Sequence, residues 1–217
     1  MKRRDFSLAA PALAVLSTAT WMPAHAQALK PAEGTDYYVL DKSVAVDAPP
    51  GKIEVVEFFW YKCPHCNSFE PALEAWSKKL PKDVVLRRVP IAFQDSFAPL
   101  QRLFYSIEAM GLTAKLHAKV FNAIHIERLN LEKGDAIIEW VAQQGVDKAK
   151  FAEQFGSFSI NSKATKATQL QNAYRVEGVP ALGVAGRFYT DGQIAKSMDR
   201  ALLVVDALVA DLRGKRT

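Results

Sequence analysis

The two cysteines of this chain, Cys63 and Cys66, lie in the stretch KCPHC, directly after an apolar run, and the 217 residues contain no others. Four uses fit the pattern: a structural zinc site, a static disulfide, two inert thiols, or reversible thiol–disulfide exchange. Structural zinc usually takes four ligands, and His65 between the cysteines is poorly placed to share their metal. A static bond across so short a loop would constrain the unfolded chain little. Redox exchange is therefore the favoured interpretation.

The residues around Cys63 favour its thiolate. Pro64 suits the first turn of a helix, which puts the Cys63 sulfur against free N–H groups and the positive end of the helix dipole. Cys66, one turn later, can bond to Cys63, so Cys63 is the expected exposed thiolate and Cys66 the shielded resolving thiol. His65 adds a donor and, when protonated, a cation; Lys62 adds positive charge. Because such groups lower a thiol pKa and make the disulfide a stronger oxidant, the pattern predicts a disulfide donor.

The elements expected around this motif indicate an α/β fold with a helical insertion. Residues 53–61 are β-branched and aromatic nearly throughout, as in a central strand buried on both faces. Apolar residues then recur at spacings of three and four, which predicts a helix over 64–80, and 83–93 reads as a strand. After a long helix-rich stretch, 178–192 predicts two strands around a turn, before a closing helix. A further short strand is expected over 34–40.

The N-terminus predicts export. Residues 1–26 combine a basic start, a mostly apolar stretch and the small residues of Ala24–Ala26, as a cleaved signal peptide does. A buried N-terminal helix is the alternative, but Pro11 and Pro23 would break it. The Arg3-Arg4 pair partly resembles a twin-arginine signal, so the Sec and twin-arginine routes both stay open. In an oxidising compartment disulfides can persist, which argues against inert thiols.

The composition is that of a globular protein and argues against other classes. The chain is 49% hydrophobic and 24% charged. Its net charge of +5 owes part to the basic residues at the N-terminus and is too mild to indicate a nucleic-acid partner. Beyond the signal, no apolar run reaches the roughly 18 residues that a membrane span needs.

Two motifs together resemble the DsbA family of exported thiol:disulfide oxidoreductases: EFFWYKCPHC at 57–66 and GVPA at 178–181. Pro-His between the cysteines is the family's own dipeptide, where thioredoxins carry Gly-Pro. The resemblance covers essentially all of the mature chain. It implies a thioredoxin-like fold, a central mixed sheet flanked by helices, with an inserted all-helical domain. After the signal, the expected divisions are a first thioredoxin-like part over 27–96, the helical insertion over 97–165 and a second thioredoxin-like part over 166–217.

The same resemblance implies a role for each motif residue. Cys63 would form the mixed disulfide with a substrate, and Cys66 would resolve it. His65 would stabilise the Cys63 thiolate. Pro180 would be cis and packed beside the disulfide, and Val179 would offer backbone groups to an extended substrate strand.

Glu57 is a further residue that the resemblance singles out. In the family a buried acid six residues before the first cysteine couples to the pair and helps to move protons. A carboxyl in an apolar strand should have a raised pKa, unless Glu57 stands at an edge and reaches water. We expect Glu70 to be a solvated helix residue, and His117 and His125 to be ordinary face or core residues. Lys62, where some members carry an uncharged residue, could strengthen the thiolate or tune partner choice.

The resemblance implies a periplasmic dithiol oxidase. Its partners would be unfolded exported proteins with free cysteines and an inner-membrane quinone reductase of the DsbB type that reoxidises it. We expect a monomer with no nucleic-acid partner and with no metal or cofactor beyond the cysteine pair. One alternative is a reductase or isomerase, although the segment before the first long strand is too short for a dimerisation domain. The other is a binding module, such as a metal carrier.

Overall fold

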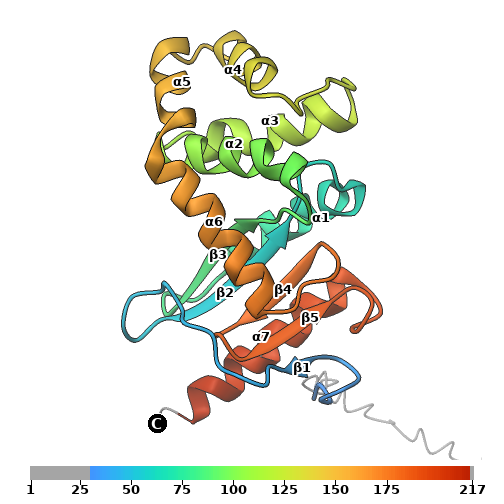
Figure 1. The fold of residues 1–217 in the computed structure, drawn as a ribbon. Helices are drawn as coiled ribbons and strands as arrows, with labels where there is room; N and C mark the ends of the chain where they lie inside the picture. The colour runs from blue at the N-terminus through green and yellow to red at the C-terminus, as the bar shows by residue number, and fades with distance from the viewer. Residues whose placement is uncertain (1–29, 216–217) are drawn as a thin grey trace, which may run out of the picture.

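A computed structural model describes residues 30–215 (Figure 1). The predicted signal peptide, residues 1–26, lies outside the described residues. The strands are β1 (Tyr38–Val39), β2 (Ile53–Phe59), β3 (Val84–Pro90), β4 (Ala181–Val184) and β5 (Phe188–Asp191). The helices are α1 (Pro64–Ser77), the 3-10 turn η1 (Asp95–Phe97), α2 (Ala98–Ala109), α3 (Thr113–His125), α4 (Gly134–Gln143), α5 (Lys148–Gly156), α6 (Phe158–Ala173) and α7 (Met198–Gly214).

Strand β2 lies inside a mixed sheet of order β1-β5-β4-β2-β3, parallel to β3 and antiparallel to β4. All seven residues of β2 are buried, Glu54 and Glu57 included, as its mostly β-branched and aromatic sequence predicts for a strand covered on both faces. The hairpin between β4 and β5 turns at Ala185-Gly186, also as predicted. Gly186 adopts a φ of +65° there, and a side chain would collide with the carbonyl oxygen of Val44.

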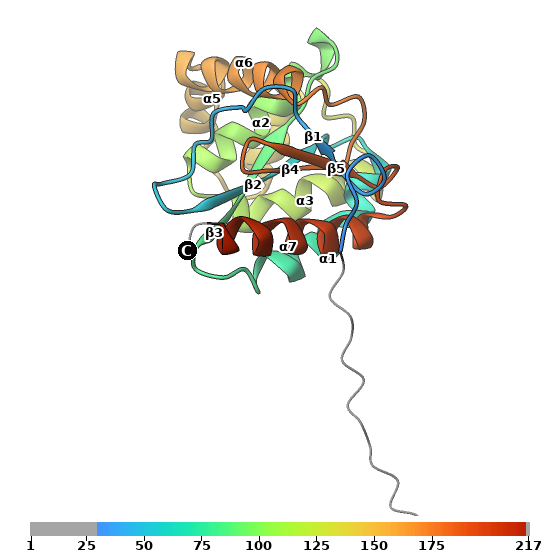
Figure 2. The same cartoon turned by 90° about the horizontal axis from the view of Figure 1, so that it is seen from below.

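Two hydrophobic cores lie on the two faces of the sheet. Helices α1 and α7 cover one face, and α6 lies on the other (Figure 2). Along β2, Ile53 and Val55 belong to the core under α1 and α7, whereas Val56 and Phe58 belong to the core shared with the remaining helices. Side chains on both faces of β2, the strand that leads into the cysteine motif, are therefore packed in a hydrophobic core.

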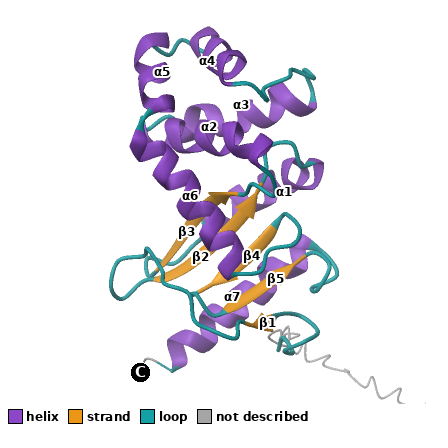
Figure 3. Ribbon diagram, in the orientation of Figure 1, coloured by secondary structure: helices purple, strands orange, loops and turns teal. Residues whose placement is uncertain are grey.

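The upper half of the molecule in Figure 3 consists of helices only, α2 to α5, inserted between β3 and α6. This arrangement confirms the predicted α/β fold with a helical insertion. Helix α6 begins at Phe158, because Ser157 caps it by accepting the N–H of Ile160 at 3.3 Å. The expected end of the insertion, between residues 165 and 166, therefore falls inside a continuous helix. Within residues 30–215 no helix is long and apolar enough to cross a membrane.

The strand predicted over 34–40 is shorter than expected, since β1 holds only two residues. Asp36 accepts the N–H of Ala32 at 2.9 Å and a hydrogen bond from Arg200 Nη2 at 2.7 Å. These contacts turn the start of the segment and attach it to α7, so that only its end can pair with β5.

Candidate active site

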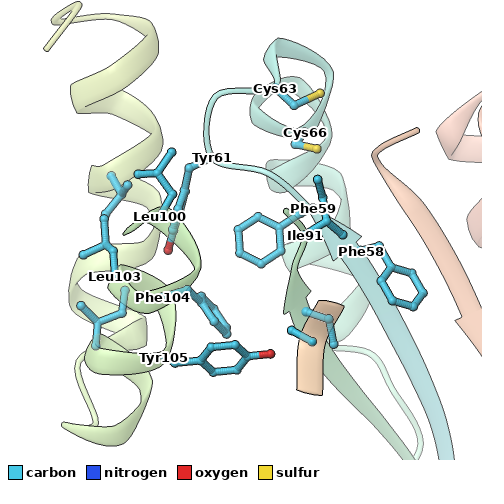
Figure 4. Packing of buried hydrophobic residues seen from close by; sticks show 14 of the residues in the cluster. Phe58, Phe59, Tyr61, Cys63, Cys66, Ile91, Leu100, Leu103, Phe104 and Tyr105 are labelled. Atoms are coloured by element: carbon cyan, nitrogen blue, oxygen red, sulfur yellow. The ribbon is translucent and has the colours of Figure 1, made fainter. Parts of the chain in front are cut away.

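The cysteine motif occupies the junction between the end of β2 and the start of α1. Cys63 is the N-cap of α1, with extended backbone (φ −77°, ψ 117°), and Pro64 is the first helical residue. The Cys63 N–H donates to the Trp60 carbonyl at 2.9 Å, which closes the turn after β2. Figure 4 shows Cys63 at the helix start, Cys66 beneath it, and Tyr61 turned away toward α2. The Cys63 sulfur therefore faces the N-terminal end of a helix, as predicted.

The two thiols differ sharply in their tendency to ionise. The pKa of Cys63 is lowered from 9.0 to about 6, chiefly by a hydrogen bond from the Cys66 thiol and further by the N–H groups of Cys66 and His65 and the charge of His65. Burial opposes this shift. Cys66 is 0% exposed, and burial together with its neighbour Cys63 raises its pKa. Near neutral pH one proton is thus shared unequally, with a thiolate favoured at Cys63 and a thiol at Cys66.

The expectation that Cys63 is exposed was wrong, because the residue is only 8% exposed, although Cys66 is more deeply buried at 0%. The loop at Val179 lies against it, and the Cys63 thiol donates to the Val179 carbonyl at 3.2 Å. The Val179–Pro180 peptide bond is cis, as the resemblance implies. The tertiary fold thus brings together the two motifs that the sequence separates by more than a hundred residues.

A groove of about 1490 Å³ begins at His65 and runs along this loop. Its walls come from the Val179–Pro180 loop, the segment 38–44 that includes β1, and the segment after β5 that reaches Met198. His65 is exposed at this edge. Neither cysteine lines the groove, which approaches the site through His65 and through Val179, whose carbonyl accepts the Cys63 thiol.

Lys62 points toward the helical insertion. Its Nζ forms an ion pair with Glu132, in the segment before α4, and lies 6.0 Å from the centre of the Trp60 ring. Its charge is therefore partly balanced by the insertion.

Glu57 lies at the centre of a buried charged cluster and not at an edge, being 1% exposed. Its pKa is raised to about 8, first by burial and then by the charge of Glu70, against the opposing charge of Arg88. Arg88 stands beside Glu57 in the parallel register of β2 and β3, with its Nε 3.3 Å from Glu57 Oε2. Glu57 consequently holds a proton at neutral pH, and its charge state influences the pKa of Cys66.

The expectation that Glu70 is solvated was wrong. Glu70 is 8% exposed, and its Oε1 accepts from Arg88 Nη2 at 2.8 Å. Glu74, one turn later, accepts from the same nitrogen at 3.1 Å. His117 is buried, as expected of a core residue, but its Nε2 faces Glu70 Oε2 at 3.5 Å. Arg88 was the sequence signal for this cluster. A charged side chain in the mostly apolar strand β3 needs acidic partners inside the protein.

Comparison with known proteins identifies the family. The model described as DSBA-like thioredoxin domain matches residues 83–202. The thiol:disulfide interchange protein DsbA of Bordetella parapertussis is 42% identical over 214 residues, covering 98% of this chain and 100% of the relative. The chain belongs to the DsbA family. The DsbA of Burkholderia cepacia is 40% identical over 193 residues, covering 89% of this chain and 91% of the relative.

Solved DsbA structures share the whole architecture. The crystal structure of Pseudomonas aeruginosa DsbA superposes with a TM-score of 0.81 at 39% identity, covering 84% of this chain and 95% of that one. The oxidoreductase DsbA from Xylella fastidiosa gives a TM-score of 0.79 at 30% identity, covering 85% and 98%. The predicted thioredoxin-like fold and the enzyme class are confirmed: this DsbA-family chain is a protein disulfide oxidoreductase.

Proposed function

We propose that this protein is a periplasmic dithiol oxidase, which donates its Cys63–Cys66 disulfide to newly exported proteins. The observation that carries the proposal is the asymmetry of the two sulfurs. The lowered pKa of Cys63, about 6, makes it a good leaving group at neutral pH. A protein that stabilises its own thiolate favours its dithiol form and so gives its disulfide away.

The exchange proceeds in two displacements. A client thiolate attacks Cys63 Sγ and forms a mixed disulfide; the Cys63–Cys66 bond breaks, and its electron pair leaves on Cys66 Sγ, which takes a proton. A second client thiolate then attacks the client sulfur of the mixed disulfide. Cys63 leaves as a thiolate that the N–H groups of His65 and Cys66 stabilise. The client is oxidised by two electrons, and the cysteine pair is reduced by two.

Glu57 supplies the proton for Cys66. Because Cys66 is fully buried, its sulfur is a poor stable anion and must be protonated as it leaves. Glu57 is buried in the neighbouring strand, and with a pKa of about 8 it is mostly protonated at neutral pH. The acid and the sulfur are also coupled, since the charge of Glu57 acts on the pKa of Cys66.

The groove beside His65 holds the client. The Val179–Pro180 loop lines this groove, and the Val179 carbonyl lies within hydrogen-bond reach of the reactive sulfur. An extended client segment in the groove would meet the backbone of Val179 while its cysteine reaches Cys63. Tyr38, 48% exposed on β1, offers an aromatic surface along the same wall.

The remaining parts of the proposal rest on membership of the DsbA family and on the signal-like residues 1–26. The chain is exported to the periplasm by the Sec or the twin-arginine route. A DsbB-type quinone reductase of the inner membrane reoxidises the cysteine pair. The protein acts as a monomer, without a metal or a cofactor and without a nucleic-acid partner.

Equilibration of the mature protein with glutathione buffers tests the direction of exchange. A reduction potential more oxidising than about −180 mV is expected, whereas a value near about −270 mV would indicate a reductase. Cys63→Ser should abolish oxidation of a reduced client peptide. Cys66→Ser is the matched control: offered the client in its disulfide form, its Cys63 thiolate should break that bond and accumulate the mixed disulfide, detectable by mass spectrometry, because no Cys66 thiol is present to resolve it. Oxidation at the normal rate by Cys63→Ser would refute the mechanism.

A further inference from the structure

His117 of α3 lies where the helical insertion meets the sheet, and it is 5% exposed. Four aromatic rings surround the imidazole, with ring centres 5.3 to 5.6 Å away, from Phe59, Tyr61, Phe104 and Phe121. In such apolar surroundings each ring nitrogen needs a polar partner. The identity of those partners determines what the residue does.

Tyr61 fixes the position of the proton on His117. The Tyr61 hydroxyl is 2.7 Å from Nδ1 and has no other hydrogen-bond partner among residues 30–215. Burial raises the pKa of Tyr61 well above its usual value, so the hydroxyl keeps its proton. Donation from this hydroxyl to Nδ1 leaves the imidazole proton on Nε2. The carboxylate of Glu70, which Nε2 faces at 3.5 Å, favours the same tautomer.

Glu70 and Glu57 share one partly buried cation, Arg88, whose side chain is 16% exposed. One carboxylate oxygen of Glu70 accepts a hydrogen bond from Arg88 Nη2, and the other faces His117 Nε2. Both oxygens of Glu57 lack a hydrogen-bond partner in the described part of the chain, although Arg88 Nε is 3.3 Å away. Glu70 Oε2 and His117 Nε2 face each other at 3.5 Å, which is also longer than a hydrogen bond in this structure. Glu74 also reaches Arg88, but its side chain is 45% exposed, so solvent moderates its charge.

Two buried carboxyls beside one guanidinium do not both ionise easily, so the pair retains one proton. The groups facing the pair come from every neighbouring element: Arg88 from β3, Glu74 and Cys66 from α1, His117 from α3, and Tyr61 from the turn after β2. Among these, Arg88 donates a hydrogen bond to Glu70 at 2.8 Å and His117 Nε2 faces the second Glu70 oxygen at 3.5 Å, whereas Glu57 has only Arg88 Nε at 3.3 Å, outside hydrogen-bond geometry. The donors therefore favour the carboxylate at Glu70 and the proton at Glu57.

We propose that His117 is a positioning residue for disulfide exchange: held by Tyr61, it directs its Nε2–H to Glu70 and so keeps the shared proton on Glu57. The use of that proton rests on the proposed function. When the Cys63–Cys66 bond breaks, the proton passes from the Glu57 carboxyl to Cys66 Sγ, leaving a carboxylate and a thiol, and solvent later restores it. Without His117 the proton would move to Glu70, on the other side of Arg88.

Carbon NMR of the full mature chain, carrying glutamate labelled with ¹³C at the side-chain carboxyl, tests the proton's position. Titration between pH 5 and 10 would follow both carboxyls, assigned with Glu57→Gln and Glu70→Gln. In the unchanged protein Glu57 should be protonated at pH 7 and Glu70 ionised. In His117→Phe the protonated share of Glu57 at pH 7 should fall to about half or less, and that of Glu70 should rise correspondingly.

Two further variants separate positioning from packing. His117→Gln should restore the original titration, because its amide N–H can replace Nε2–H. His125→Phe is the matched control on the same helix, since His125 Nε2 bonds the Tyr61 carbonyl at 2.8 Å and not Glu70. It should leave the Glu57 and Glu70 titrations unchanged. An unchanged titration in His117→Phe, or an equal shift in His125→Phe, would overturn the proposal.

If His117→Phe does not fold, Tyr61→Phe and His117→Gln decide the question. Removing the hydroxyl frees Nδ1 and should shift the proton toward Glu70; no shift there would overturn the proposal. Client oxidation at pH 7, measured in parallel, should slow several-fold whenever Glu57 loses its proton. If the titrations behave as expected but the unchanged protein fails to oxidise the client, the proposed function fails and the placement of the proton stands.

Discussion

The lowered pKa of Cys63 predicts that the dithiol form loses stability on acidification and the disulfide form does not. The folded pKa, about 6, is below the ordinary value of 9.0. The thiolate's contribution is therefore complete above pH 9 and disappears as the pH falls through 6. A fall in the Cys63 pKa from 9.0 to about 6 corresponds to about 4 kcal/mol of thiolate stabilisation, and partial solvent screening reduces that free energy to roughly 2 kcal/mol. At pH 7 only the part between pH 6 and 7 is realised, about 1 kcal/mol.

Urea unfolding of both redox forms between pH 4.5 and 8 measures this contribution. The free energy of unfolding of the dithiol form, relative to that of the disulfide form, should fall by about 1 kcal/mol from pH 7 to pH 5. Groups that titrate alike in both forms cancel in the difference. The reduced Cys63→Ser variant, which keeps only the Cys66 thiol, should lack this loss of stability on acidification. Parallel pH dependence of the two redox forms would show that Cys63 carries no stabilised thiolate.

Three further perturbations test the cluster and the hairpin. Arg88→Met should lower the free energy of unfolding by about 3–5 kcal/mol, because it leaves Glu57 and Glu70 buried without a cation; adding Glu57→Gln should recover part of the loss in chemical denaturation. Glu57→Gln alone should slow client oxidation in stopped-flow assays and remove its pH dependence near pH 8; an unchanged profile would exclude Glu57 as the proton donor. Gly186→Ala should destabilise by more than about 1 kcal/mol, seen as a lower Tm, because φ is positive and the carbonyl of Val44 is in the way; an unaltered Tm would contradict this.

The sequence predicted those features of the site that depend on local order. Pro64 begins α1 where expected, so the position of Cys63 at the helix start followed from neighbouring residues alone. The β-branched and aromatic residues of β2 likewise predicted a buried strand, while the edge alternative for Glu57 was decided only by the pairing of β2 with both β3 and β4. The cis bond before Pro180 came from the family resemblance, because the contacts around it join distant segments.

The features that sequence reasoning missed all depend on partners from elsewhere in the chain. Glu70 lies on the buried face of α1, four residues after Cys66 and three before Leu73, and it was expected in solvent only because its side chain is charged. Its burial comes from Arg88 on β3 and His117 on α3, neither of which local pattern can place beside it. Arg88 itself was a visible clue, since a charge in an apolar strand requires compensation inside the protein.

The order of elements along the chain also has a consequence for synthesis. Strand β2 carries the cysteine motif at its end, yet its antiparallel neighbour β4 is one of the last strands to be made. The carbonyl that meets the Cys63 thiol, at Val179, follows it by 116 residues. A nascent chain therefore displays both sulfurs long before these later surroundings exist. Any product cut or stalled ahead of β4 would lack the Val179 carbonyl and the strand pairing beside β2, although the groups that lower the pKa of Cys63 all lie within the CPHC motif itself.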